Sequence, residues 1–256
     1  MGGVAAPAGR FAGRTAVVTG AAAGIGEATA RRLAGEGASV ILADISPRGE
    51  DVAAALRQCG HQALFVQADV AAEDGWAVLS ETARRAWGGA DILVSNAYAA
   101  ETAAAHEMSR ASWDHQIAVC LTATFLGVRA FLPDLRERSG AVVVTSSVHA
   151  VIGLPGRPAY AAAKGGLTAL TRQLAVEYGP DVRVNCVLPG PIRTAAWDRV
   201  SEEDRRRSVA ATVARRFGEP AEVAAAIAFL ASPDASYITG ASLVVDGGWS
   251  IVKASA

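Results

Sequence analysis

Cysteine is scarce in this 256-residue chain, and the scarcity is informative. The three cysteines, Cys59, Cys120 and Cys186, are odd in number and far apart in the sequence. This pattern disfavours both a disulfide framework and a zinc site, and it favours a reducing compartment. We therefore predict no metal and expect a cytoplasmic protein.

Strong net charge and long apolar runs are missing too. The formal net charge is −1, so the composition gives no reason to expect a nucleic acid or an acidic membrane surface as partner. No stretch approaches the roughly 18 uncharged apolar residues of a membrane span. The opening residues MGGVAAPAGR lack the features of a signal peptide. These absences predict a soluble protein with no nucleic acid or membrane partner.

What the sequence does contain is an alternation of two kinds of segment. Continuous apolar strands separated by helices are typical of a parallel sheet that is buried on both faces. We therefore predict an α/β fold with one domain over residues 1–256, a Rossmann-like doubly wound parallel sheet of about seven strands flanked by helices on both faces. The expected strands are 15–20, 38–44, 62–69, 90–96, 140–147, 182–188 and 241–248, and the expected helices are 24–36, 47–59, 73–87, 112–135, 159–178 and 220–231.

The least regular part of the chain is residues 190–219. It contains the charge run SEEDRRR (201–207), which is usually a solvated helical face, with a lid as the alternative. We expect 190–219 to cover the substrate within the single domain.

A glycine-rich turn follows the first expected strand. In VVTGAAAGIGEA (17–28), Gly20, Gly24 and Gly26 permit a tight turn that brings backbone N–H groups and a helix N-terminus to a pyrophosphate. The turn alone is weak evidence, because its spacing differs from G-x-G-x-x-G and no Lys follows as in a phosphate-binding P-loop.

Asp44 ends the second expected strand, 18 residues after Gly26, where a carboxylate would accept hydrogen bonds from adenosine ribose hydroxyls. The alternative is a helix cap, but Ser46 and Pro47 resemble an N-cap and a first-turn proline, which would leave Asp44 free. A carboxylate repels a 2′-phosphate, and Ile45 offers that phosphate no attraction. Asp44 therefore predicts NAD rather than NADP as cofactor.

Tyr160 precedes Lys164 by four residues in PAYAAAKGG (158–166), so a helix would place both side chains on one face. On its own the pair fits an ordinary helix with a core tyrosine and a solvated lysine. The small residues around it would also let such a helix lie close to a cofactor.

Together these motifs resemble the classical short-chain dehydrogenase/reductase family over nearly the whole chain. The resemblance is carried by six motifs in order: TGAAAGIG (19–26), DV (69–70), Ser147, the Y-x-x-x-K of Tyr160 and Lys164, PGPIRT (189–194) and YITGASLVVDGG (237–248). It implies Ser147, Tyr160 and Lys164 as catalytic residues. The cofactor-binding positions it implies, taken with the reasoning above, are Gly20, Ala23, Gly24, Ile25, Gly26, Asp44, Ile45, Asp69, Val70, Asn96, Ala97, Tyr160, Lys164, Pro189, Gly190, Ile192 and Thr194.

The predicted chemistry is the interconversion of a secondary alcohol and a ketone. A free phenol has a pKa near 10, about three units too high for a good base at neutral pH. The nearby Lys164 ammonium and the positive nicotinamide ring would together favour the phenolate and lower the pKa of Tyr160. The resemblance adds that Lys164 holds the nicotinamide ribose. Ser147 would orient the substrate oxygen, although a serine at a strand end also commonly serves a turn.

Two departures from the family stand out. Tyr98, in SNAY (95–98), replaces a family glycine and would narrow the pocket or alter the local backbone. Cys120 replaces a family asparagine that completes a catalytic tetrad, and a thiol, as a weak donor and weak acceptor, is not expected to replace the hydrogen bonds of an amide.

Three side chains are candidates for substrate contact: Tyr98, His149 and Trp197. Structural roles remain open for His149, two residues after Ser147, and for Trp197, at the start of the irregular segment. We expect ordinary surface or core roles for His61, His106 and His115.

The sequence favours an NAD-dependent oxidoreductase acting on a small-molecule alcohol or ketone. Two alternatives remain: a weakly catalytic nucleotide-binding sensor or scaffold on the same fold, and an NADPH-preferring ketoreductase. Family resemblance further implies a homo-oligomer, usually a tetramer.

Overall fold

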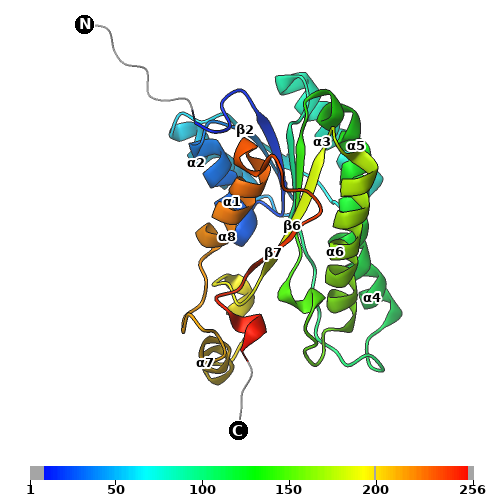
Figure 1. Cartoon of the computed structure of the whole chain (residues 1–256), viewed down its shortest axis with the longest axis vertical. Coiled ribbons are helices and arrows are strands. Elements are labelled where there is room, and N and C mark those ends of the chain that lie inside the picture. The colour runs from blue at the N-terminus through cyan, green and yellow to red at the C-terminus, as the bar shows by residue number, and fades with distance from the viewer. Residues whose placement is uncertain (1–8, 199, 253–256) are drawn as a thin grey trace, which may run out of the picture.

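Seven parallel strands form the centre of the molecule (Figure 1). The computed structural model describes residues 9–198 and 200–252, so the ends of the predicted domain 1–256 and most of MGGVAAPAGR lie outside the described residues. The strands are β1 (Thr15–Thr19), β2 (Ser39–Asp44), β3 (Ala63–Gln67), β4 (Ile92–Ser95), β5 (Ala141–Thr145), β6 (Arg183–Pro189) and β7 (Ser242–Val245), in the sheet order β3-β2-β1-β4-β5-β6-β7. The predicted doubly wound sheet is confirmed.

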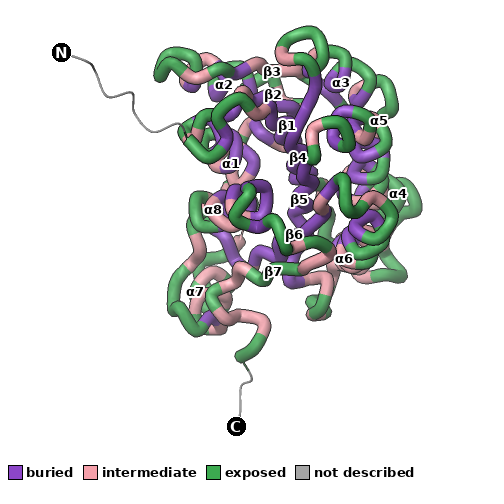
Figure 2. The backbone as a smooth tube through the Cα atoms, turned by 45° about the horizontal axis from the view of Figure 1, so that its top comes forward, coloured by how far each residue is buried: buried purple, intermediate pink, exposed green. Residues whose placement is uncertain are grey.

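Helices cover both faces of this sheet because successive strand residues point in opposite directions. Val18 packs into one apolar cluster with α1 (Gly24–Gly35), α2 (Gly49–Gln58) and α8 (Pro220–Ala231). Its neighbour Val17 packs into the other, with α3 (Glu73–Trp87), α5 (Ala123–Glu137) and α6 (Pro158–Tyr178). Figure 2 shows the strands as the buried centre between the two helical layers. The continuous apolar strands of the sequence are explained by this double burial.

The strand order reverses between β1 and β4, and this switch point determines where ligands can enter. The ends of the two strands are joined there by Asn96. Its backbone N–H donates to Thr19 Oγ1 at 2.9 Å, and its side-chain amide donates to Thr19 O at 2.9 Å. Asn96 thus fixes the carboxyl ends of β1 and β4 at the mouth of the crevice.

The predicted helix 112–135 is interrupted. The chain forms α4 (Arg110–Ile117), a π-helical turn at Ala118–Thr122 and then α5. The Ala123 N–H donates to the carbonyl of Ala118, five residues back, which is the π-helical spacing. Cys120 lies in this turn, so the backbone is irregular at the position where the family has asparagine.

The same run, Arg110–Glu137, is the one helical stretch of the described residues that is both long and apolar enough to cross a membrane. An 18-residue window has a mean hydropathy of 1.5, so by length and composition alone it could span a membrane, contrary to the expectation from sequence. A helix that covers a buried sheet meets the same criterion, and 44% of this window is buried inside the molecule. Phe131 and Leu135 are fully buried against the sheet.

The segment 190–219 contains more helix than its sequence suggested. A 3₁₀ turn at Ala195–Trp197 precedes α7 (Glu202–Ala210), while residue 199 lies outside the described residues. Ser201 caps α7 by accepting a hydrogen bond from the Asp204 N–H at 3.1 Å. No residue of α7 is buried, so the charge run forms a solvated helix below α8 in Figure 1. Other 3₁₀ turns of the described chain lie at Val148–Ala150, Pro233–Ala235 and Trp249–Ile251.

Candidate active site

A cavity of about 670 Å³ opens at the carboxyl ends of the strands. Its size is within the range of small-molecule and cofactor sites. Almost every site residue expected from the sequence lines it: Gly20, Ala23, Gly24, Ile25, Asp44, Ile45, Asp69, Val70, Asn96, Ala97, Tyr98, Ser147, His149, Tyr160, Lys164, Pro189, Gly190, Ile192, Thr194 and Trp197. Gly26 is the exception.

The glycine turn forms one wall of the cavity. Gly20 and Gly24 have φ values of +65° and +60°, which side chains rarely adopt, and a Cβ on Gly20 would lie 2.9 Å from Ala97 Cα. Gly26 lies behind this wall, where a Cβ would lie 2.0 Å from the Gly20 carbonyl oxygen. Helix α1 begins at Gly24 with no side-chain cap. Its first N–H groups are therefore left for an anion.

Asp44 is more engaged than its sequence suggested. One carboxylate oxygen accepts from the Ala22 N–H and the other from the Ser46 N–H, both at 2.9 Å. Helix α2 starts at Gly49 with Arg48 at its N-cap, so the prediction that Ser46 caps this helix is wrong. Asp44 therefore ties the glycine turn to the β2 loop, and each oxygen keeps a lone pair for a ligand hydroxyl.

The loop after β3 and the neighbouring residue Ile45 of the β2 loop border the same end of the cavity. Asp69 accepts from the Ala71 N–H at 2.9 Å, and the Val70 carbonyl accepts from the Trp76 indole at 2.8 Å. These bonds fix the loop after β3 beside Asp44. Ile45 is 69% exposed at the rim, so a large side chain there meets solvent and ligand rather than core.

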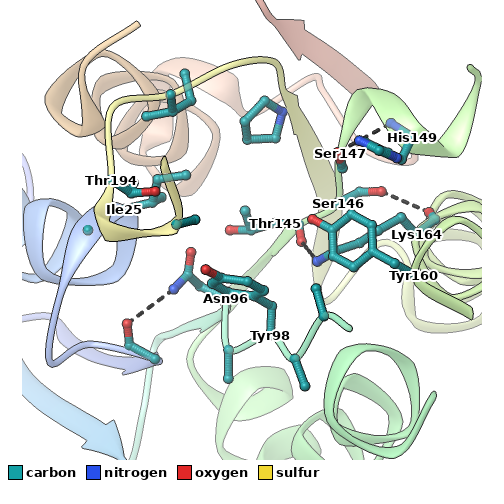
Figure 3. Close-up of a pocket in the computed structure, with 18 of the residues that line it drawn as sticks. Ile25, Asn96, Tyr98, Thr145, Ser146, Ser147, His149, Tyr160, Lys164 and Thr194 are labelled. Atoms are coloured by element: carbon teal, nitrogen blue, oxygen red, sulfur yellow. Dashed lines mark hydrogen bonds between the residues drawn. The ribbon is translucent and has the colours of Figure 1, made fainter. Parts of the chain in front are cut away.

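Lys164 is fully buried on the opposite wall (Figure 3). Its ammonium donates to the Thr145 carbonyl at 2.7 Å, and the Ser146 hydroxyl donates to the Lys164 carbonyl at 2.8 Å. Burial lowers the pKa of Lys164. Two of its three N–H donors remain for a ligand, and beside it the Thr145 hydroxyl is buried without a partner among the described residues.

Tyr160 lies beside Lys164, whose Nζ is 5.4 Å from the centre of the phenol ring. Burial raises the pKa of Tyr160 to about 12, the Cys120 thiol adds to the rise, and the Ser147 hydroxyl and the Arg157 charge oppose it. Without a cofactor the pKa is thus raised, whereas the predicted lowering was for Lys164 together with a nicotinamide ring. The physical reason is that removing the phenol from water outweighs the neighbouring charges when no ligand is bound.

Ser147 and His149 flank Tyr160. The Ser147 hydroxyl accepts from the His149 N–H at 3.2 Å, and the imidazole packs edge-to-face on the phenol with ring centres 5.3 Å apart. Burial, followed by the charges of Arg157 and Lys164, lowers the pKa of His149. Its Nδ1 is buried without a partner among the described residues, so the imidazole retains hydrogen-bonding capacity at the cavity wall.

Tyr98 and Trp197 are at the outer end. Tyr98 is 55% exposed and does not have a positive φ, so replacing the family glycine leaves the backbone unstrained while the ring narrows the entrance. Trp197 packs on Phe217 with ring centres 4.6 Å apart. The Trp197 carbonyl accepts from Arg205 Nε at 2.9 Å, which attaches the 3₁₀ turn to α7.

The loop after β6 is fixed by backbone hydrogen bonds to Gly218. The Arg193 N–H donates to the Gly218 carbonyl at 2.8 Å, and the Gly218 N–H donates to the Pro191 carbonyl at 3.0 Å. This two-bond clamp places Ile192 and Thr194 at the cavity. A Cβ on Gly24 would lie 3.3 Å from the Thr194 methyl group, so the clamp brings β6 and the glycine turn together.

Sequence reasoning missed several lining residues. His115, expected in an ordinary role, lines the cavity, as do Val119, Leu154, Arg157, Ser208 and Trp249. One signal was available: Arg157 precedes Tyr160 by three residues at the start of the same helix. The others come from segments far apart in sequence, which only the packed structure brings together.

These residues fit a nicotinamide dinucleotide. The glycine wall has no side chains where a pyrophosphate must approach. At one end of the cavity, the Asp44 carboxylate can accept hydrogen bonds from ribose hydroxyls. At the other end, Lys164 has spare donors and the Thr145 hydroxyl has no partner in the described chain. Figure 3 shows Ile25 and Thr194 facing Tyr160 and Ser147 across the space between.

Comparison with known proteins agrees with this geometry. A family model described as enoyl-(acyl carrier protein) reductase matches residues 20–250. Cis-4-hydroxycyclohexanecarboxylate dehydrogenase of Sinomonas cyclohexanicum is 44% identical, covering 94% of this chain and 98% of that protein. Glucose 1-dehydrogenase 2 of Bacillus subtilis (strain 168) is 40% identical, covering 93% and 95%. The crystal structure of gox2181 has a TM-score of 0.91 at 32% identity, covering 95% and 98%.

The similarity extends through the cavity as well as the sheet, because the matched residues include the glycine turn, the Tyr160–Lys164 pair and the loop after β6. The protein is therefore an oxidoreductase with a dinucleotide-binding fold that acts on a small-molecule substrate. Within that class, the chain belongs to the short-chain dehydrogenase/reductase family, whose dehydrogenases use NAD or NADP. The resemblance inferred from the sequence is confirmed.

Proposed function

We propose that this protein is an NAD-dependent dehydrogenase that oxidises a secondary alcohol on a six-membered ring to the ketone. The observation that carries the proposal is the convergence of Ser147, Tyr160 and Lys164 on one wall of the cavity, facing the glycine turn. A substrate hydroxyl between these walls would contact both Tyr160, the proton acceptor, and the Ser147 hydroxyl, a hydrogen-bonding partner.

Asp44 supports NAD over NADP. Its carboxylate lines the cavity beyond the glycine turn, and at about 4 Å it would repel each unit of 2′-phosphate charge by about 1–4 kcal/mol. The neighbouring Ile45 is apolar and exposed, so it supplies no compensating attraction.

Tyr160 would take the hydroxyl proton as a general base, and the same group would return it in ketone reduction. Ser147 would hydrogen-bond the reacting oxygen and hold the alcohol carbon toward the nicotinamide. A bound nicotinamide would supply the hydride acceptor that the oxidation of the alcohol carbon to a carbonyl requires. Lys164 would hold the ribose with its two spare N–H groups while the third stays on Thr145.

The high pKa of Tyr160 imposes a requirement on this mechanism. At about 12 the phenol is almost wholly protonated at neutral pH. A cationic ring placed beside it, in a site where Lys164 is already buried, would favour the phenolate. The proposed base is thus activated by cofactor binding rather than in the free protein.

The ring alcohol is supported by the walls and by the relatives. The outer cavity is lined by Val119, Leu154, Trp197 and Trp249, which suit a compact hydrocarbon body. The two relatives are named for a hydroxylated cyclohexane ring and for glucose, both six-membered rings.

A panel of cyclic and acyclic secondary alcohols, each assayed with NAD and with NADP, tests the proposal through reduced-nicotinamide absorbance. We expect NADH formation from cyclohexanol-type substrates and a strong preference for NAD. An efficient reaction with NADP would support the ketoreductase alternative instead. The weakly catalytic alternative would show cofactor binding without turnover of any alcohol in the panel.

We also propose a homo-oligomer, usually a tetramer in this family, in a reducing compartment such as the cytoplasm. Exposed apolar side chains on α4, α5 and the edge strand β7, including Trp113, Phe125, Leu243 and Val244, support association. The three cysteines are all unpaired, which supports the reducing compartment. Light scattering coupled to size exclusion measures the assembly directly.

A further inference from the structure

Arg157 is a cation that lines the cavity and pairs with no carboxylate in the described part of the chain. It is partly buried, and a guanidinium removed from water without an anion is unfavourable. The position of Arg157 therefore calls for an anionic partner that the protein itself does not provide.

The guanidinium is not needed to start the helix. Arg157 is the N-cap residue of α6, but its side chain makes no capping hydrogen bond. Its backbone carbonyl accepts from the Ala161 N–H at 2.9 Å, a contact that any side chain would permit. The charged group is thus available to the cavity.

The charge acts on the reaction centre. Burial is the main cause of the pKa shifts at Tyr98, His149 and Tyr160, and the Arg157 charge lowers the pKa of all three. All three side chains line the cavity, and Figure 3 shows Tyr160 between Tyr98 and His149. The guanidinium is therefore close to the place where the substrate, rather than the adenosine, would lie.

Charge is divided along the cavity. The acidic lining residues among those described are Asp44 and Asp69, both at the end assigned to adenosine. The cations are Lys164, already bonded to the Thr145 carbonyl, and Arg157. The substrate half thus combines apolar walls with the buried Lys164 ammonium, which is held by a backbone carbonyl, and the Arg157 guanidinium, which no carboxylate of the described chain neutralises.

We propose that the substrate is a hydroxy-monocarboxylic acid and that Arg157 binds its carboxylate while Ser147 and Tyr160 bind its hydroxyl. The planar fork of a guanidinium matches a carboxylate with two parallel hydrogen bonds. A single guanidinium between apolar walls suits one monoanion on a hydrocarbon ring. This inference rests on the proposed dehydrogenase function and specifies its substrate class.

Matched acid and amide probes test the inference. We expect the wild type to oxidise 3- or 4-hydroxycyclohexanecarboxylate with a kcat/KM about tenfold or more above that of the corresponding carboxamide, as a charged hydrogen-bonded pair implies. In Arg157→Gln the acid-over-amide preference should disappear through a higher KM for the acid, whereas any effect through Tyr160 should lower kcat for the acid and the amide alike. Arg157→Lys should retain part of the preference for the acid over the amide. Arg172→Gln, on the same helix but outside the cavity, should leave it intact.

A binding measurement separates recognition from a role of Arg157 in activating Tyr160. Cyclohexanecarboxylate and cyclohexanecarboxamide, which carry no hydroxyl to oxidise, are titrated calorimetrically into enzyme saturated with NADH. Tighter binding of the acid to wild type, lost in Arg157→Gln, supports the proposal. Equal binding of acid and amide, or an acid preference that survives in Arg157→Gln, overturns it.

The outcomes also distinguish this inference from the proposed function. If cyclohexanol is oxidised with NAD but the acids gain nothing over the amides, the carboxylate inference alone fails. If no alcohol reduces NAD, the dehydrogenase function fails and the inference fails with it. The preference should also be constant from about pH 7 to 9, because a guanidinium does not titrate there.

Discussion

The Cys120 thiol pairs with both backbone groups of Ala99. Its sulfur donates to the Ala99 carbonyl at 3.2 Å and accepts from the Ala99 N–H at 3.3 Å. The thiol thus makes one donor and one acceptor contact at the position where the family has asparagine. The sulfur joins the π-helical turn to the loop after β4, which carries Tyr98 into the cavity.

Because of this pairing, we expect that placing the family asparagine at position 120 has only a small effect on turnover. Cys120→Asn should fold and change turnover by less than about tenfold, because an amide also offers one donor and one acceptor and the π-helical backbone is already present. Cys120→Ala is the matched loss variant, expected to lower the free energy of unfolding by about 1 kcal/mol. Turnover and urea unfolding measure the two effects. A hundredfold gain in Cys120→Asn would mean that the natural protein has an impaired proton relay.

The sheet was predictable because strands that are buried on both faces appear in the sequence as short continuous apolar runs. In AVVVT (141–145) the first four residues are apolar and all five are buried, since both faces of the sheet are covered. The interruption at Ala118–Thr122 was not predictable from periodicity, because its residues are individually compatible with an ordinary helix and only the backbone bonding departs.

Tyr160→Phe separates binding from proton transfer. Loss of the hydroxyl should lower kcat by about 10² or more while NAD affinity changes little, since only the proton-transfer group is removed. Tyr178→Phe is the control: Tyr178 is on the same helix but stacks on Arg136, away from the cavity. Initial rates and NAD titration of both variants provide the comparison. Near-normal turnover in Tyr160→Phe would exclude it as the base.

The pKa of Tyr160 should depend on the cofactor. In the free protein burial holds it near 12, so phenolate absorbance assigned to Tyr160 should appear only at very high pH. With NAD bound, the positive ring should move that titration below about pH 10. Ultraviolet difference titration of wild type against Tyr160→Phe isolates this one phenol. A titration unaffected by NAD would contradict activation by the cofactor.

The presence of Ser147, Tyr160 and Lys164 in one cavity was predictable from the family motifs, whereas the electrostatics of the cavity were not. The six motifs together pointed to Tyr160 and Lys164, but the direction of the tyrosine pKa depends on how completely the fold excludes water. Arg157 likewise carries no motif of its own. Its role emerges only because the acids of the cavity, Asp44 and Asp69, lie at the other end.

Cofactor choice should change at Asp44 and Ile45. Asp44→Ala with Ile45→Arg removes repulsion of a 2′-phosphate and adds attraction, which should raise the NADP/NAD ratio of kcat/KM by about tenfold or more. Ile45→Arg alone should give a smaller rise, because the carboxylate remains. The double variant also loses the bonds to the Ala22 and Ser46 N–H groups and should unfold more easily. Efficient use of NADP by the wild type would contradict the role given to Asp44.

Two glycines of α1 should respond oppositely to alanine. A Cβ on Gly26 would lie 2.0 Å from the Gly20 carbonyl oxygen and 2.6 Å from Asn96 Nδ2, so the helix would have to move away from the glycine turn. Gly26→Ala should therefore lose about 1–3 kcal/mol of unfolding free energy and weaken NAD binding. A Cβ on Gly35, in the last turn, meets nothing within 4 Å. Gly35→Ala should be neutral or stabilising by up to about 1 kcal/mol, because alanine favours helix.

Urea unfolding and NAD titration of the two variants decide the point. Both variants make the same chemical change in the same helix, so a difference between them reports packing against the turn rather than helix propensity. If Gly26→Ala bound NAD as tightly as Gly35→Ala, the close approach of α1 to the turn would not be what shapes the pyrophosphate site. The glycine wall would then not define a dinucleotide site.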